Sequence, residues 1–218
     1  ALADISHRLN ESSEVILVNN GMIDRANLTP LIQGARLLFG LNTSGAYRVD
    51  DYEVVQAGQG QLRLGPGAEP DWFGRFQAAV PGSSWIVDIE PYRWQKLAVN
   101  AVINPLTALH NCLNGDLELE RHSAQTQDLI DELTILLAYQ GFAEIAQTFN
   151  QECWRVIQQT SQNRSSMNQD AAQQRPTEIE FILKPWLRYA GEHQLAVPHL
   201  TQLYDSFRAR FLPIGSDD

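Results

Sequence analysis

The stretch from Trp85 to Asn104 reads WIVDIEPYRWQKLAVNAVIN, and the spacing of its apolar residues changes partway along it. Up to Ile89 the apolar residues cluster as in a short buried strand. After Pro91 they recur at the i, i+3, i+4 spacing of a helix that buries one face. The change predicts an α/β region over residues 1–90, followed by an all-α region over residues 91–218.

The region before this boundary is rich in glycine and in β-type runs. Val15-Ile16-Leu17-Val18 is expected to be a strand buried on both faces, ended by the turn signal Asn19-Asn20-Gly21. Residues 52–56 and 61–64 are expected to pair through a hairpin at Gly58-Gln59-Gly60. Other strands are expected over 36–40 and 85–89, with helices near 27–30 and over 70–80. Such a unit is typical of half of a doubly wound sheet.

The region after the boundary has helical periodicity almost throughout. Helices are expected over residues 94–113, 123–140, 142–159, 177–193 and 199–211. The polar segment 161–175 is expected to be a loop or an exposed helix start. A polar segment inside a helical region is a candidate site.

Composition disfavours several classes of partner. Lys and Arg total 16 against 26 Asp and Glu, a formal charge of −10 with a pI near 4.9. Such a surface repels nucleic-acid phosphates and anionic membranes. Residues 97–115 lack charged side chains, but their asparagines and Pro105 argue against a membrane span. Cys112 and Cys153 match no disulfide framework or zinc motif, and buried thiols in a reducing cytoplasm are expected.

Two patterns that could suggest a cofactor or a metal fail on closer inspection. Gly58-Gln59-Gly60-Gln61-Leu62-Arg63 begins like a dinucleotide fingerprint, but Arg63 replaces its third glycine and the segment lies between expected strands. The five histidines show no pair at metal-ligand spacing, so no metal site is expected.

Lys96, Asn100 and Asn104 form the clearest chemical pattern. Their i, i+4, i+8 spacing places them on one face of one helix, although asparagine is a poor helix former. One interpretation is a pair of buried amides that cap a neighbouring loop. The other is a polar track in a cleft. There the ammonium would supply a proton or a positive charge, and the amides would bind a small polar anion whose carbonyl must be protonated.

Two further segments carry polar groups at expected helix starts. Asn163-Arg164-Ser165-Ser166-Met167 places an amide and two hydroxyls before a helix. In Thr177-Glu178, the threonine is expected to be the N-cap and the glutamate a first-turn acid. Taken alone, each segment has the commoner interpretation of an ordinary helix cap.

Together these segments resemble the ketopantoate reductase (2-dehydropantoate 2-reductase) family. The resemblance covers essentially the whole chain, and its most specific part is the Lys-x3-Asn-x3-Asn-Pro run. It is carried by Asn20-Gly21-Met22, Gly65-Pro66, Trp94–Ala108, Asn114-Gly115, Asn163–Asp170 and Arg175–Glu180. It implies the second half of a Rossmann-type NADPH-binding domain over 1–90. Residues 91–218 would form an all-helical substrate-binding and catalytic domain of the 6-phosphogluconate dehydrogenase-like type, with substrate between the two domains.

The resemblance also implies roles for individual residues. The expected activity is NADPH-dependent reduction of ketopantoate to (R)-pantoate in pantothenate biosynthesis, in the cytoplasm. Lys96 would be the general acid, and Glu178 a second catalytic residue that also lies at the cofactor. Asn20 would face the cofactor. The residues expected to bind the substrate are Asn100, Asn104, Asn114, Asn163 and Ser166. Whether the protein forms a homodimer is left open by the resemblance.

The sequence departs from the family at its start. The family begins with a strand and a Gly-x-Gly-x-x-Gly turn that seats the pyrophosphate, and nothing before Val15 corresponds to them. The chain is therefore expected to be an N-terminally incomplete enzyme or a truncated relative. The alternatives are a non-catalytic binding or assembly module whose open sheet edge a partner covers, and a reductase of another branched 2-keto acid.

Overall fold

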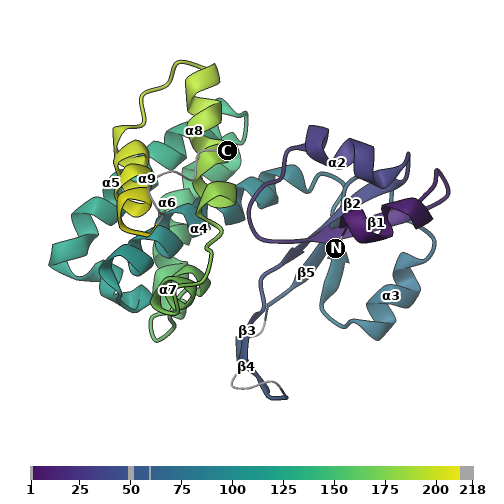
Figure 1. Cartoon of the computed structure of the whole chain (residues 1–218), viewed down its shortest axis with the longest axis horizontal. Coiled ribbons are helices and arrows are strands. Elements are labelled where there is room, and N and C mark those ends of the chain that lie inside the picture. The colour runs from purple at the N-terminus through teal and green to yellow at the C-terminus, as the bar shows by residue number, and fades with distance from the viewer. Residues whose placement is uncertain (1, 49–51, 59, 212–218) are drawn as a thin grey trace. The chain divides into compact units, whose positions relative to one another are not determined.

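The computed structural model describes residues 2–48, 52–58 and 60–211. The chain divides into two compact units (Figure 1). The first contains Ala1–Asn19 and Ile23–Arg93, and the second contains Asn20–Met22 and Trp94–Asp218. The division that the sequence predicts near residue 90 thus falls at residue 93, and a short early segment joins the later unit.

The first unit is built on a four-stranded sheet of order β1-β2-β5-β6. Its strands are β1 Glu14–Val18, β2 Arg36–Asn42, β5 Leu62–Gly65 and β6 Ser83–Trp85. The pairs β1–β2 and β5–β6 are parallel, and β2–β5 is antiparallel, so the sheet is mixed. Short helices α1 Leu2–Ile5 and η1 Ser6–Arg8 precede β1, α2 Arg25–Ile32 connects β1 to β2, and α3 Phe73–Ala79 connects β5 to β6.

The predicted hairpin between residues 52–56 and 61–64 is wrong. Strand β4 Val54–Gly58 pairs with β3 Gly45–Arg48 in a separate two-stranded sheet, and β5 pairs with β2 and β6. The glycine signal marks a close crossing instead, because a Cβ on Gly60 would lie 2.2 Å from the backbone at Thr43. Gln59, the centre of the predicted turn, lies outside the described residues.

Two further strand predictions need correction. β1 is not buried on both faces, since Ile16 and Val18 are 37% and 52% exposed. The reason is that β1 lies at an edge of the sheet, with β2 as its strand neighbour in the described part of the chain. The last strand ends at Trp85 rather than Ile89, because Ile89 turns inward to pack with Phe39 just before the next helix begins.

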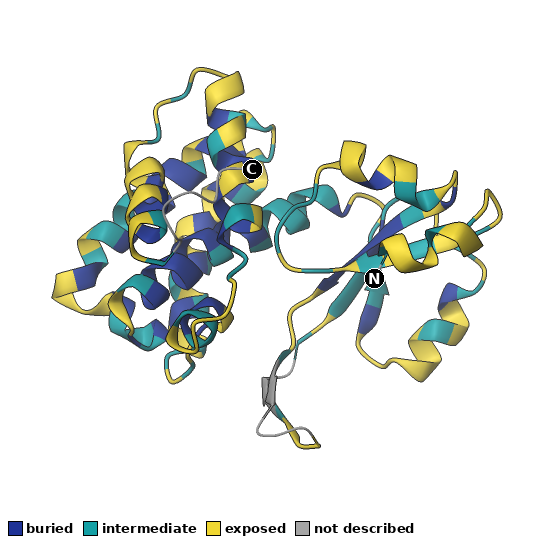
Figure 2. Ribbon diagram, in the orientation of Figure 1, coloured by how far each residue is buried: buried dark blue, intermediate teal, exposed yellow. Residues whose placement is uncertain are grey.

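The second unit is helical, and its elements follow the predicted periodicity. They are α4 Glu90–His110, which belongs to this unit from Trp94 onward, η2 Asn114–Glu118, α5 Glu120–Tyr139, α6 Ala143–Gln159, α7 Ser166–Ala172, α8 Ile179–Glu192 and α9 Pro198–Phe211. The helices share one apolar core, the dark interior in Figure 2, in which Leu106, Phe149, Trp186 and Phe207 have no exposed surface. An α/β region followed by an all-α region is therefore confirmed.

Polar contacts fix the ends of several helices. Glu132 of α5 is 8% exposed and accepts hydrogen bonds from the backbone amides of His199 (2.7 Å) and Leu200 (2.8 Å). It thereby satisfies amides at the start of α9 that have no partner inside the helix. Asp24 does the same for α2 through the Ala26 amide, at 2.9 Å.

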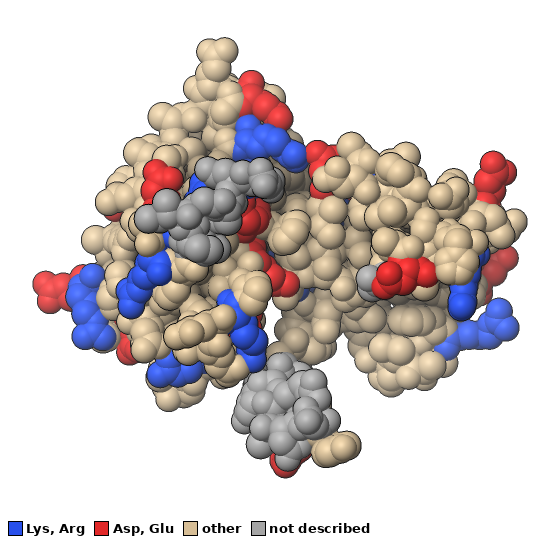
Figure 3. All heavy atoms as spheres, viewed as in Figure 1, with Lys and Arg blue, Asp and Glu red and all other residues tan. Residues whose placement is uncertain are grey.

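The uncharged stretch 97–115 forms most of α4, and its middle is buried among the other helices of the unit. Among the residues that the structure describes, no helix has both the length and the apolar character to cross a bilayer. Both cysteines are buried as expected, and burial raises the pKa of the Cys153 thiol to about 12. On the face drawn in Figure 3, acidic and basic side chains are interspersed among uncharged ones.

Candidate functional site

Lys96 is half-buried on the helical unit. It lies on the second turn of α4, and its Nζ donates a hydrogen bond to Asn20 Oδ1 at 3.1 Å. Burial lowers the pKa of the Lys96 ammonium, and the negative charge of Glu178 acts in the opposite direction. The site therefore joins a partly desolvated cation, a carboxamide and a carboxylate that come from distant parts of the sequence.

The segment Asn20–Met22 is fixed against the start of α8, and this fixes Asn20 beside Lys96. The Met22 amide donates to the Phe181 carbonyl at 2.9 Å. Gly21 has a positive φ of 74°, and a Cβ there would lie 2.7 Å from both the Cβ and the carbonyl oxygen of Phe181. No side chain fits at this position, so glycine is required for the close approach.

We expect Gly21→Ala to destabilise the helical unit and to displace Asn20. The left-handed backbone alone costs a residue with a Cβ about 1–2 kcal/mol. The contact with Phe181 adds to that cost, and a misplaced Asn20 would lose its hydrogen bond with Lys96. Thermal melting measures the loss of stability, and a crystal structure of the variant shows whether the contact with Lys96 is kept.

Gly141→Ala is the matched control, because Gly141 also has a positive φ, of 88°, but has open space around its Cβ position. It should show the cost of the left-handed backbone and keep the hydrogen bond between Lys96 and Asn20. If both variants behave alike, the contact between Gly21 and Phe181 does not position Asn20.

Asn100 and Asn104 follow Lys96 at one-turn intervals on the same face of α4. Asn104 is 8% exposed. Within residues 2–48, 52–58 and 60–211, neither side-chain amide has a hydrogen-bond partner. They do not cap a neighbouring loop, which was one of the two interpretations, and their donors and acceptors remain available to a ligand.

The segment before α7 places Asn163 and Ser166 close together in sequence but in different surroundings. Ser165 is the N-cap, since its hydroxyl accepts the Asn168 amide at 3.0 Å. Ser166 is the first helical residue and is exposed. The Asn163 carbonyl accepts the Asn114 amide at 2.9 Å, which ties this segment to the loop that follows α4.

Asn114 is 6% exposed, and its Nδ2 donates to Thr160 Oγ1 at 2.9 Å. Its Oδ1 is buried and has no partner among the described residues. One half of this amide is therefore used in packing η2 against the end of α6, and the other half stays unsatisfied. A buried acceptor without a donor carries a free-energy cost.

The predicted N-cap at Thr177 is wrong. α8 begins at Ile179 with Glu178 at the N-cap position, and the Glu178 side chain makes no capping hydrogen bond. The Thr177 hydroxyl is buried without a partner among the described residues. The helix thus starts later than the threonine signal indicates, and the Glu178 carboxylate is left to act on Lys96.

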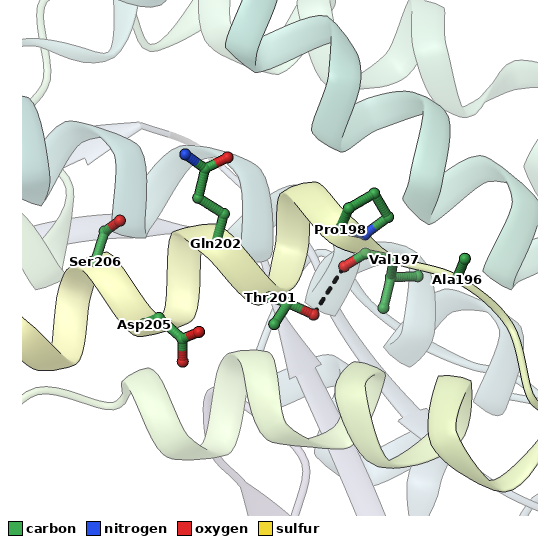
Figure 4. A pocket seen from close by; sticks show the side chains of 7 residues that line it. All are labelled: Ala196, Val197, Pro198, Thr201, Gln202, Asp205 and Ser206. Atoms are coloured by element: carbon green, nitrogen blue, oxygen red, sulfur yellow. Dashed lines mark hydrogen bonds between the residues drawn. The ribbon is translucent and has the colours of Figure 1, made fainter.

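A pocket of about 600 Å³ lies elsewhere, along α9 and the loop before it. Its lining consists of Ala196, Val197, Pro198, Thr201, Gln202, Asp205 and Ser206 (Figure 4). In it the Thr201 hydroxyl donates to the carbonyl of Val197, the residue just before α9, at 2.9 Å. None of the residues discussed above lines it, so we do not place the functional site there.

The chemistry of the site is that of proton donation and small-anion binding. It has one ammonium, one carboxylate and several neutral amides, and the described residues contain no group of three potential metal ligands. An α/β unit followed by a helical unit with such a lysine site defines a class of two-domain proteins with a polar site on the helical part.

Comparison with known proteins identifies the family within this class. Residues 88–211 match the family described as "Ketopantoate reductase PanE/ApbA C terminal", and residues 1–69 match "Ketopantoate reductase PanE/ApbA". The chain belongs to the ketopantoate reductase family, as the sequence motifs predicted. The 2-dehydropantoate 2-reductase of Vibrio cholerae is 32% identical over 213 residues, covering 95% of this chain and 72% of that protein. That of Salmonella typhimurium is 33% identical over 215 residues, covering 96% and 69%.

Solved structures show the same fold. The probable 2-dehydropantoate 2-reductase panE from Bacillus subtilis superposes with a TM-score of 0.73 at 29% identity, over 90% of this chain and 68% of that one. D-mandelate dehydrogenase with NADH and anilino(oxo)acetate gives 0.81 at 17% identity, over 96% and 71%. The partial Rossmann-type unit with a helical C-terminal domain is confirmed.

Proposed function

We propose that this protein reduces ketopantoate to (R)-pantoate with NADPH, the step that supplies pantoate for pantothenate synthesis. The observation that carries the proposal is the Lys96 ammonium, which is partly buried, hydrogen-bonded to Asn20 and in the field of Glu178. Membership of the reductase family supports it, as do curated relatives with this activity in their names.

The residues present fit one end of a nicotinamide cofactor. Asn20 follows β1, and dinucleotides bind at the carboxyl ends of parallel strands in sheets of this kind. Its amide and the Glu178 carboxylate would hold the nicotinamide end. The Gly58–Arg63 pattern does not supply a pyrophosphate turn, since it lies between β4 and β5 rather than before a helix. Bound NADPH would supply a hydride to the ketone carbon.

Lys96 would complete the reduction at the ketone oxygen. Negative charge develops on this oxygen in the transition state, and an ammonium beside it stabilises the charge and then donates a proton. Burial lowers the pKa of Lys96 and so makes it a stronger acid. Glu178 opposes that shift and keeps the amine protonated.

Asn100, Asn104, Asn163 and Ser166 would bind the hydroxyl and carboxylate of the substrate, and Asn114 would make a further polar contact. Amides and a hydroxyl are neutral, directional groups that recognise an alcohol as well as a carboxylate. A substrate analogue without the hydroxyl would leave such groups unpaired and would be rejected.

The decisive test is an assay of the protein as its gene encodes it, with ketopantoate and NADPH. We expect loss of NADPH absorbance together with formation of pantoate. A branched 2-keto acid of the same carbon skeleton without the hydroxyl should react far more slowly. Faster reaction of that analogue would assign the enzyme to branched 2-keto acids without the hydroxyl. Absence of turnover with both acids would overturn the reductase proposal.

Glu178→Gln should shift the alkaline limb of the profile of kcat/KM against pH. The reaction needs protonated Lys96, so activity falls as the pH rises through the pKa of Lys96. Glu178 raises this pKa, and its neutralisation therefore lowers it. The limb of kcat/KM against pH should shift to lower pH in the variant.

Glu180→Gln is the matched control on the same helix. Glu180 accepts from Tyr204 at 2.8 Å and pairs with Lys184 at 2.5 Å, and its charge is not among the causes that shift the pKa of Lys96. This variant should leave the limb in place. A Glu178→Gln profile that superposes on the wild type would show that Glu178 does not control Lys96.

A further inference from the structure

A buried polar network links the second half of α4 to the start of α7. Its members are Thr107, Ser165 and Asn168, which are 0%, 7% and 1% exposed. The proposed reduction of ketopantoate uses none of these three side chains. Polar groups buried this deeply are nearly always hydrogen-bonded, so each donor and acceptor of the network should have an identifiable partner.

The two hydroxyls form a chain with a fixed direction. The Thr107 hydroxyl donates to the Ile103 carbonyl at 2.7 Å, so its single proton is used. Ser165 must then be the donor in the 2.7 Å contact between the two hydroxyl oxygens. Ser165 Oγ in turn accepts the Asn168 backbone amide at 3.0 Å. The chain runs from α7 to the backbone of α4.

The Asn168 side chain closes a second link between the same elements. Both protons of its Nδ2 are used, one on the Thr107 carbonyl at 2.7 Å and one on the Cys112 carbonyl at 2.8 Å. Its Oδ1 accepts from Arg164 Nη1 at 3.2 Å, and the same nitrogen donates to Asn111 Oδ1 at 3.0 Å. One amide thus connects the end of α4, the loop after it and the segment before α7.

The residues held in this way are adjacent in sequence to the proposed substrate ligands. Asn163 and Ser166 lie on either side of Arg164 and Ser165, and the next residue, Met167, is anchored in the core at 2% exposure. Asn104 lies three residues before Thr107 on α4. The network therefore connects the segment that carries Asn163 and Ser166 to the helix that carries Asn104.

We infer that Asn168 is a positioning residue that sets Asn163 and Ser166 against α4, and so sets the affinity for the hydroxy-keto acid. The inference rests on the proposed function. Asn168 is 1% exposed and its side-chain nitrogen and oxygen are bonded to protein groups, so it acts through the two ligands rather than on the substrate itself. Its spacing from Ser165, three residues, is that of an N-cap and its N3 partner, which is the sequence signal that could have indicated it.

The first test is Asn168→Ala, measured by steady-state kinetics in the full protein. We expect KM for ketopantoate to rise about tenfold or more, with KM for NADPH and the pH limb of Lys96 unchanged. A purely structural role would lower the folded fraction and hence the apparent kcat, but would leave KM for ketopantoate unaltered. Asn150→Ala is the matched control, because Asn150 is exposed on α6 of the same unit.

The second test separates the hydroxyl chain from the volume of the side chain at position 107. Thr107→Val keeps the shape but removes the hydroxyl that Ser165 donates to, whereas Thr107→Ser retains it. We expect faster amide hydrogen exchange over residues 163–168 and a raised ketopantoate KM in Thr107→Val, and near wild-type values in Thr107→Ser. The exchange measurement does not depend on activity.

The outcomes distinguish this inference from the function on which it rests. A wild-type protein that does not turn over ketopantoate overturns the proposed function. An active wild type, with Asn168→Ala and Thr107→Val both within about twofold in ketopantoate KM, overturns the positioning role and leaves the function standing. A raised KM in both, with rescue by Thr107→Ser, supports it.

Discussion

Lys96→Ala should lower kcat for ketopantoate reduction by about 10²- to 10⁴-fold, the range that a positioned general acid contributes. The variant loses both the charge that stabilises the developing alkoxide and the proton that neutralises it. Ketopantoate binding should fall much less, because the amides and the serine that would hold the substrate remain. Stopped-flow measurement of NADPH oxidation in single turnovers isolates the chemical step.

Lys184→Ala is the control for this experiment. Lys184 is the other lysine of the chain, lies on the exposed side of α8 and pairs with Glu180. Its removal deletes the same charge from the same unit and should leave kcat within about twofold of the wild type. If Lys96→Ala retains wild-type single-turnover rates, proton donation by Lys96 is excluded.

Trp186→Ala should cost the helical unit about 3–5 kcal/mol in free energy of unfolding. Trp186 has no exposed surface, and its ring packs edge-on against Trp94 with centroids 4.8 Å apart. Removing it leaves a large cavity beside the turn of α4 that carries Lys96. Urea denaturation followed by far-ultraviolet circular dichroism reports on this unit, because it holds most of the helix.

Two variants calibrate that result. Tyr139→Ala removes an aromatic ring that is 61% exposed on α5 and should change the stability by about 0.5 kcal/mol or less. Trp186→Phe should cost less than Trp186→Ala, because the indole Nε1 is buried without a partner among the described residues. Equal costs for Trp186→Ala and Tyr139→Ala would contradict the core position of Trp186.

The sequence predicts the helices well because each one carries its own burial pattern. Helices α5, α6, α8 and α9 have apolar faces that repeat along a single segment, so local spacing is enough to find them. Strand pairing depends on segments that are distant in sequence. The β2–β5 and β3–β4 pairs could not be derived from local glycine signals, and the predicted hairpin failed for that reason.

The candidate site divides in the same way. Lys96, Asn100 and Asn104 share one helix, and their spacing alone places them on one face. The contact of Lys96 with Asn20 spans 76 positions, and no periodicity in the sequence indicates it. The start of α8 was predicted one position too early, because a threonine is a frequent N-cap and nothing local shows that its hydroxyl faces the interior.

The assignment of Asn20–Met22 to the helical unit limits how this protein can be divided in the laboratory. Asn20–Met22 belong to the helical unit, and the chain rejoins that unit at Trp94. A recombinant fragment starting at Trp94 would retain the lysine but lose the carboxamide that hydrogen-bonds to it. When domains are exchanged between relatives, these three early residues should therefore be transferred together with the C-terminal half. Such an exchange needs two separate segments of sequence and cannot be made at one junction.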